Sequence, residues 1–183
     1  MSNESHASAV ETWGKIRNLD IEAFKSRTPH FFLLGLFVPQ DQQRQKFATL
    51  SGDTAGASTP VSKGLPQPVP SSEVVPLQKR EGVSLADKIT VGRTQNNDCV
   101  ITDLLVSKLH GYFSVSGQGQ ISFTDSGSSN GTRIGGKTAP PFESIPLHSR
   151  THMTFGTRAA YLFVSAEDLY KILQDMLKSE PVS

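Results

Sequence analysis

Short apolar runs separated by glycine, asparagine and serine dominate the second half of the chain. Residues 112–115 and 121–124 alternate apolar with polar side chains, which predicts two β-strands that each turn one face to a core. Gly117 and Gly119 lie between these runs and supply a hairpin turn. Further strands are predicted for residues 89–91, 99–101, 153–155 and 159–164. Many short strands at close spacing predict an all-β sandwich of two antiparallel sheets.

The sequence before residue 80 predicts two more strands and a long segment without regular structure between them. The continuous apolar run 31–38 predicts the first strand of the sandwich, buried on both faces, although periodicity alone also fits a buried helical turn. Residues 74–77 contain a proline and predict an edge strand. Residues 51–72 are rich in Gly, Ser, Thr and Pro and cannot bury enough apolar surface to offset their ordering entropy. We therefore expect a flexible insertion or linker there.

Helices are predicted at both ends of the chain. Ser8 and Glu11 have the spacing of a capping box, and Trp13 belongs to the short apolar stripe that follows. A second short helix is predicted around residues 20–25. After Ser165, apolar residues recur at helical spacing, at Leu169, Ile172, Leu173, Met176 and Leu177. We expect Trp13 and this C-terminal stripe to pack on the sandwich, with a partner-binding role as the alternative.

These elements divide the chain into three predicted parts. An N-terminal helical extension covers residues 1–28, the sandwich covers residues 29–165, and the C-terminal helix covers residues 166–183. The length suits one domain with a core plus extensions.

Charge and composition narrow the class of partner. Lysine and arginine number 18 against 17 acidic residues, a formal net charge of +1, so no broad field favours nucleic acid or a membrane surface. The single cysteine, Cys99, excludes an internal disulfide and fits a reducing compartment as a small core residue. No secretory signal is visible, and the longest apolar run is far shorter than the roughly 20 residues of a membrane span. We expect a soluble cytoplasmic protein.

Three polar clusters stand just outside predicted strands. They are Gly92-Arg93, Ser107-Lys108-Leu109-His110, and Ser128-Ser129-Asn130-Gly131-Thr132. Strand ends are where an all-β scaffold carries its binding loops, because the sheets are rigid and the loops can vary. One arginine with several hydroxyls and an amide indicates a site for an anionic group that accepts many hydrogen bonds.

The order and spacing of these clusters resemble the forkhead-associated (FHA) domain, a reader of phosphothreonine peptides. The match is sharp over residues 89–132 and extends to 164, so the best-matched core is residues 89–164. The family often has Asn-Gly shortly after its third cluster, where this chain has Gly135-Gly136, and either pair makes a hairpin turn. The resemblance implies an FHA-like β-sandwich.

The resemblance also implies a role for each cluster. Arg93, Ser107, Lys108, Ser129 and Asn130 would bind the phosphopeptide, with Arg93 as the cation, Ser107 as the most direct hydroxyl and Asn130 on the peptide backbone. Structural support of the site would come from Gly92, His110, Gly131 and Thr132. Gly92 would let the backbone turn sharply at the strand end.

Catalysis finds little support in the sequence. His148 and His152 have the spacing of a zinc-binding pair, but the segment lacks the glutamate base and leads into a strand. Ser107 and His110 lack any third member of a triad or an oxyanion hole. We expect no enzyme activity, no metal and no cofactor.

Two functions of different classes remain. The first is a phosphothreonine-dependent interaction module, a signalling adaptor that needs an upstream Ser/Thr kinase and a phosphorylated partner. The second is a phosphate-independent scaffolding module that uses the sandwich face or the terminal helices.

Overall fold

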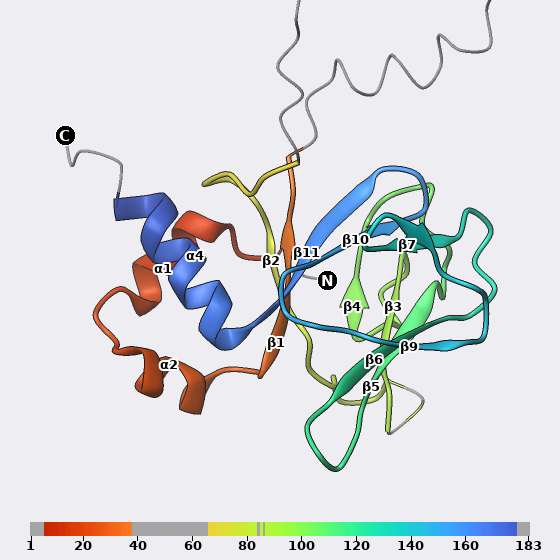
Figure 1. Cartoon of the computed structure of the whole chain (residues 1–183), viewed down its shortest axis with the longest axis horizontal. Helices are drawn as coiled ribbons and strands as arrows, with labels where there is room; N and C mark the ends of the chain where they lie inside the picture. The colour runs from red at the N-terminus through yellow and green to blue at the C-terminus, as the bar shows by residue number, and fades with distance from the viewer. Residues whose placement is uncertain (1–5, 38–65, 84, 86, 179–183) are drawn as a thin grey trace, which may run out of the picture.

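The protein is built in three layers, two β-sheets and one layer of helices (Figure 1). The computed structural model describes residues 6–37, 66–83, 85 and 87–178. The helices cover the outer face of one sheet, and the second sheet packs on the inner face of the same sheet. Within the described residues, no helix is long and apolar enough to cross a bilayer.

One sheet has six strands in the order β2-β1-β11-β10-β7-β8, and every neighbouring pair is antiparallel. Its strands are β1 (Phe31–Gly35), β2 (Val74–Pro76), β7 (Thr132–Ile134), β8 (Lys137–Thr138), β10 (Thr151–Phe155) and β11 (Ala159–Ser165). The other sheet has five strands in the order β4-β3-β5-β6-β9. Its strands are β3 (Ile89–Gly92), β4 (Cys99–Val100), β5 (Gly111–Val115), β6 (Ile121–Asp125) and β9 (Ser144–Pro146). Only β3 and β4 pair in parallel among the described strands. The predicted sandwich is confirmed.

Inward-facing aromatic rings fill the space between the sheets. Phe113 and Phe123 form a cross-strand pair with ring centroids 5.1 Å apart, as the alternating pattern predicts. Phe163 from the other sheet stacks on Phe113 at 6.4 Å, and Phe155 meets Phe123 edge to face at 5.7 Å. Aromatic pairs of this kind add to the burial of apolar area, so these rings join the two sheets into one core.

Strand β1 is buried on both faces because it lies between two cores. Leu33 faces the other sheet, whereas Phe32 and Leu34 face the helices. The strand pairs with β2 on one side and β11 on the other, so its backbone groups are bonded along both edges. Residues 31–35 of the continuous apolar run thus form a strand, so the helical alternative is wrong for them. The strand ends before the predicted boundary, and Val38 lies outside the described residues.

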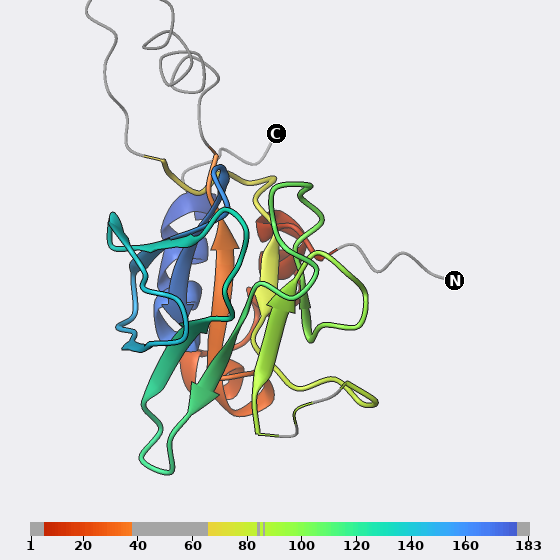
Figure 2. The same ribbon diagram turned by 90° about the vertical axis from the view of Figure 1, so that its right-hand side faces the viewer.

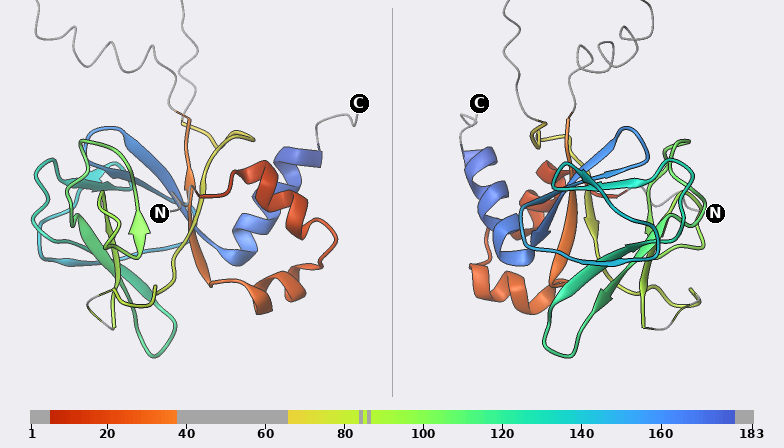
Figure 3. Two further views of the ribbon diagram at one scale, coloured as in Figure 1. Left: turned by 180° about the vertical axis from the view of Figure 1, so that it is seen from behind. Right: turned by 45° about the vertical axis from the view of Figure 1, so that its right-hand side comes forward.

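Three helices form the outer layer, α1 (Ala9–Ile16), α2 (Ile21–Arg27) and α4 (Ala166–Lys178). Helix α1 begins with the predicted capping box, in which Ser8 and Glu11 satisfy each other's backbone donors. Helix α2 begins at the cap residue Asp20. Seen from behind in Figure 3, the three helices gather on the side of β1 away from the five-stranded sheet.

The helices bury a second core against the sheet. Leu169 and Leu173 of α4 are fully buried, together with Phe24 of α2. Trp13 packs edge to face on Tyr170 with centroids 5.7 Å apart, so it contacts α4 within this layer. The N-terminal extension and the C-terminal helix therefore form one unit with the sandwich.

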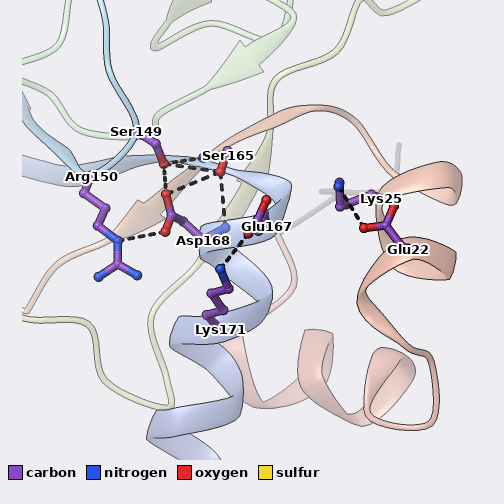
Figure 4. A network of polar contacts seen from close by, with 8 residues as sticks. All are labelled: Glu22, Lys25, Ser149, Arg150, Ser165, Glu167, Asp168 and Lys171. Carbon is purple, nitrogen blue, oxygen red and sulfur yellow. Dashed lines mark hydrogen bonds and ion pairs between the residues drawn. The ribbon is translucent and has the colours of Figure 1, made fainter.

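A polar network fixes the direction in which α4 leaves β11 (Figure 4). The Asp168 carboxylate accepts from the guanidinium of Arg150 at 2.8 Å and from the hydroxyl of Ser149. The Asp168 N–H donates to the Ser165 hydroxyl at 3.2 Å, which caps the helix. Exposed ion pairs of this kind contribute about 0–1 kcal/mol, so the network orients the helix more than it stabilises the fold.

Part of the interval predicted to be flexible is packed. Ser72 is buried, and its carbonyl accepts from the N–H of Ala9 at 2.7 Å. The carbonyl of Pro70 accepts from Val10 at 3.0 Å. The prediction of a flexible segment at residues 51–72 is therefore wrong at its C-terminal end, where Pro70 and Ser72 bond to α1 and Gln67 bonds to Phe37. Residues 51–65 lie outside the described residues, as do 179–183 of the predicted C-terminal part.

Replacing Leu173 by alanine tests whether the helical layer stabilises the sandwich. A fully buried leucine leaves a cavity when truncated, so we expect the free energy of unfolding to fall by about 2–5 kcal/mol. Lys171→Ala on the exposed face of the same helix is the matched control and should change it by less than about 0.5 kcal/mol. Urea unfolding followed by circular dichroism measures both, and equal midpoints for the two variants would contradict this account.

Candidate functional site

Four loops meet at one end of the sandwich. They follow β3, β4, β6 and β10. Backbone hydrogen bonds join the first loop to the second, from Arg93 to Ser107, and the fourth to the third, from Gly156 to Gly131. Figure 2 shows the β5–β6 hairpin at the lower end of the sandwich, with these loops at the opposite end. All three sequence clusters lie on these loops or on the strand residues next to them, since Gly92 ends β3 and Thr132 begins β7.

Arg93 enters the site directly after β3. Its N–H donates to the Ser107 carbonyl at 2.9 Å, which joins the first loop to the second. A guanidinium N–H of Arg93 donates to the Leu104 carbonyl at 3.0 Å. None of the described carboxylates pairs with this guanidinium, so within the described residues its positive charge has no ion-pair partner.

Gly92 is required by close packing. A Cβ at this position would lie 2.2 Å from the carbonyl oxygen of Lys108 and 2.8 Å from the side-chain nitrogen of Asn97. The backbone of Gly92 does not have a positive φ, so the expected sharp turn is the wrong reason for this glycine. Any larger residue would push the Lys108 segment away from β3.

Asn97 is a support residue that the sequence clusters did not reveal. Its buried amide donates to the carbonyls of Lys108 at 2.7 Å and Thr94 at 2.9 Å, so it holds the first loop to the second. The carboxylate of the neighbouring Asp98 accepts hydrogen bonds from the N–H and from the hydroxyl of Thr90. Only the Asn-Asn-Asp triplet at 96–98 signals this role in the sequence.

Ser107, Ser129 and Asn130 are brought together from the second and third loops. The Ser129 N–H donates to the Ser107 hydroxyl oxygen at 3.0 Å, which leaves the hydroxyl proton of Ser107 able to donate elsewhere. The Asn130 side-chain amide donates to the Leu105 carbonyl at 2.9 Å. The fourth loop joins them, since the Gly156 N–H donates to the Gly131 carbonyl at 2.9 Å.

A buried carboxylate, Asp125, holds the third loop in shape. One of its oxygens accepts from the backbone N–H groups of Gly127 and Ser128 at 2.9 and 2.7 Å. The other accepts from the hydroxyls of Ser128 and Thr132 at 2.8 and 2.6 Å. Burial by itself would raise the pKa of Asp125, but these hydrogen bonds and nearby His110 lower it below its ordinary value. Asp125, like Asn97, belongs to none of the three sequence clusters.

His110 is fully buried and links the second loop to the third. Its Nδ1 accepts from the Ser107 N–H at 3.2 Å, so Nε2 carries the proton and donates to the Thr132 hydroxyl at 3.1 Å. Burial lowers the pKa of His110, against the opposing effect of Asp125, so the neutral ring is favoured. The ring accepts from the backbone of Ser107 and not from its hydroxyl, which is unlike a nucleophile and its base.

Exposure separates the predicted site residues into two groups. The side chains of Lys108, Ser129 and Asn130 are exposed, and Arg93 and Ser107 are partly exposed. The predicted support residues are less accessible, with Gly92, His110 and Thr132 buried and Gly131 partly exposed at φ +69°. Residues with free donors therefore line the surface, whereas those below it hold the loops. In the described part of the chain, no group of His, Cys, Asp and Glu could hold a metal ion.

Comparison with known proteins agrees with the resemblance read from the sequence. Residues 89–156 match the family model described as the FHA domain. No curated protein matches the sequence. The chain is similar to the solved FHA domain of the CT664 protein from Chlamydia trachomatis, with 16% identity, a TM-score of 0.45, and coverage of 73% of this chain and 96% of that one.

Two further similar structures contain bound peptides. The yeast Dun1 FHA domain, in complex with a doubly phosphorylated peptide, has 17% identity and a TM-score of 0.47 and covers 77% of this chain and 78% of its own. The N-terminal FHA domain of S. cerevisiae Rad53p, in complex with a phosphothreonine peptide, has 17% identity and a TM-score of 0.44, and covers 54% of this chain and 88% of its own.

His110→Gln should separate the support role from pH effects. The glutamine keeps a donor for Thr132 but loses the acceptor for the Ser107 N–H, so we expect a loss of about 1–3 kcal/mol in the free energy of unfolding. Parent stability should fall as pH drops below about 6.5, because the unfolded chain takes up the histidine proton before the folded chain does. The free energy of unfolding of the variant should fall less than that of the parent over the same pH range.

The measurement is urea unfolding of the free protein at about pH 7.5 and 5.5. The lowered pKa of Asp125 places its own contribution at lower pH, because stability from a depressed carboxyl is lost only as pH falls through its folded value. Equal losses in parent and variant between the two pH values would show that His110 does not carry the effect.

Proposed function

We propose that this chain, whose residues 89–156 match the FHA domain, binds phosphothreonine-containing segments of a partner protein. The binding surface is the loop end of the sandwich. A module of this kind acts as an adaptor in the cytoplasm, downstream of a Ser/Thr kinase that phosphorylates the partner.

The observation that carries the proposal is an arginine that pairs with no carboxylate among the described residues and lies beside hydroxyl and amide donors. Arg93 and Ser107 are held together by a backbone hydrogen bond of 2.9 Å, and Ser129 is held to Ser107 by another of 3.0 Å. Three loops thus present their polar side chains at one place before any ligand arrives. A positive charge left without an acidic partner supports an anionic ligand.

Phosphate suits this donor set better than a carboxylate does. A phosphothreonine carries about −1.5 to −2 charge at neutral pH and three strong acceptor oxygens. A guanidinium gives two parallel hydrogen bonds to such a group, and the Ser107 hydroxyl adds a third from another direction. Lys108, exposed next to Ser107, adds positive charge.

Asn130 suits the peptide backbone on either side of the phosphate. One amide N–H is engaged by the Leu105 carbonyl at 2.9 Å, which fixes the orientation of the side chain. The second N–H and the side-chain oxygen are left for a main-chain carbonyl and N–H of the ligand.

Arg93→Ala should abolish phosphopeptide binding and leave the fold intact. The side chain makes one bond to a loop carbonyl and packs in neither core, so its loss costs little stability. Losing a charged partner of the phosphate should weaken binding by about 2–5 kcal/mol, and Arg93→Lys should recover little because an ammonium cannot form the bidentate pair.

Arg27→Ala is the matched control, since it removes the same charge from α2 in the helical layer. Calorimetric titration with a phosphothreonine peptide and thermal melting of all three variants provide the measurements. Parent-like affinity in Arg93→Ala at an unchanged melting temperature would remove the arginine from the site.

One peptide in four forms tests the ligand chemistry: unmodified, Glu-substituted, phosphoserine and phosphothreonine. We expect only the last two to bind well, because a planar carboxylate leaves at least one donor unpaired. Phosphoserine should bind several-fold more weakly, since one methyl group is worth about 1 kcal/mol. Affinity should also fall as pH drops through about 6, where the phosphate takes up a proton.

Fluorescence anisotropy with the four labelled peptides decides between the two functions. Equal binding of the unmodified and phosphothreonine forms would favour the phosphate-independent module. His110→Gln is the natural control for the pH series, because it lacks the buried histidine that titrates in the protein itself.

A further inference from the structure

Phe142 combines high exposure with an unfavourable backbone conformation. It lies between β8 and β9, its side chain is 74% exposed, and its φ is +66°. A bulky residue with positive φ is a genuine outlier that carries backbone strain. Leu104 is similarly exposed at 79% but is not among the residues with positive φ. The protein therefore maintains an exposed aromatic ring against a local energetic preference.

The ring lies against the third loop of the site. A Cβ built on Gly127 would lie 2.7 Å from the Cζ atom of Phe142, so the tip of the ring contacts the backbone there. Gly127 itself has φ +79° and has no side chain to obstruct the ring. Only one residue, Ser128, separates Gly127 from Ser129 of the proposed phosphopeptide site.

The backbone under Phe142 is tied to the residue that shapes this loop. The Phe142 N–H donates to the carbonyl of Asp125 at 2.8 Å, and Pro141 forms a bridge with Asp125. Pro140 precedes Pro141, and two successive prolines have little freedom in φ. The backbone of Phe142 is therefore held next to the start of the third loop before a ligand binds.

Polar bonds already close the third loop without help from the ring. The Asp125 carboxylate accepts from two backbone N–H groups and two hydroxyls of residues 127–132. In the described part of the chain, no buried side-chain nitrogen or oxygen lacks a partner. A strained, exposed ring that the loop does not need indicates a role in contacting something outside the chain.

We propose that Phe142 determines specificity by packing against a large aliphatic or aromatic side chain of the phosphorylated partner. The inference rests on the proposed phosphothreonine site, because the ring lies beside the loop that carries Ser129 and Asn130. Its chemistry is apolar, whereas the site residues supply charge and hydrogen bonds. A rigid aromatic ring loses little conformational freedom on binding, so an apolar contact there adds efficiently to affinity.

The decisive variant is Phe142→Gly, which removes the ring and also relieves the positive φ. Leu85→Gly is a matched control. Leu85 is another apolar residue with positive φ (+68°) and 49% exposure, and it precedes β3 at the end of that strand away from Arg93. Phe142→Tyr is the conservative variant that retains the ring.

The probe is a library of phosphothreonine peptides with one fixed phosphothreonine and mixed residues at the flanking positions. The parent should select large apolar residues at one flanking position, and Phe142→Gly should lose that selection. Affinity for the best single peptide should fall roughly tenfold, the change expected when part of an aromatic contact is lost. Leu85→Gly and Phe142→Tyr should select as the parent does.

Thermal melting separates specificity from support of the loop. We expect Phe142→Gly to melt within about 3 °C of the parent and to keep its preference for phosphothreonine over unmodified peptide. A lower melting temperature with equally weakened binding of every peptide would overturn the inference, because the ring would then be part of the loop's support. Unchanged selection in Phe142→Gly would overturn it too, with the proposed phosphothreonine site intact. Absence of phosphate-dependent binding by the parent would overturn both.

Discussion

A chain of buried and partly buried hydrogen bonds from Asp125 through Thr132 and His110 to Ser107 sets the geometry of the site. Each link is directional: the Ser107 N–H donates to His110, His110 donates to the Thr132 hydroxyl, and Thr132 donates to Asp125. The chain spans both sheets and the two loops that carry Ser107 and Ser129. Because a buried polar group without a partner costs about 1–3 kcal/mol, moving either loop breaks several bonds together.

This constraint explains the division between buried and exposed residues. The groups below the surface are fully engaged with one another, so they can specify loop positions but cannot bind a ligand. The exposed groups above them have donors to spare. The helical layer does not compete for this space, because α1, α2 and α4 cover the outer face of β1 and β11, whereas the loops lie at one end of the sandwich (Figures 1 and 2).

Sequence patterns predict those parts of the structure that depend on local neighbours. Alternation identified β5 and β6, and the capping box identified α1, because both signals lie within a few residues. Asn97 was missed because its partner Lys108 lies on another loop. Asp125 was missed although it bonds to residues 127–132 of the loop that follows it, because no spacing rule marks such a carboxylate. The sequence pattern also selects Gly92, but for a turn, whereas its actual constraint is the carbonyl of Lys108 in the second loop. Strand β9 was missed because it is short and mostly exposed.

The contacts that the Arg93 guanidinium makes before binding affect how strongly it can attract the phosphate. A guanidinium paired with a carboxylate would have to give up that ion pair or remain partly neutralised, and either would weaken its attraction for the ligand. In this protein the guanidinium instead donates to the Leu104 carbonyl at 3.0 Å. Arginine has five N–H donors, so this bond restricts the side chain and leaves the other N–H groups for phosphate oxygens. The Arg93 guanidinium therefore keeps its full charge. Part of the conformational entropy of its side chain is already lost on folding, so less is lost on binding.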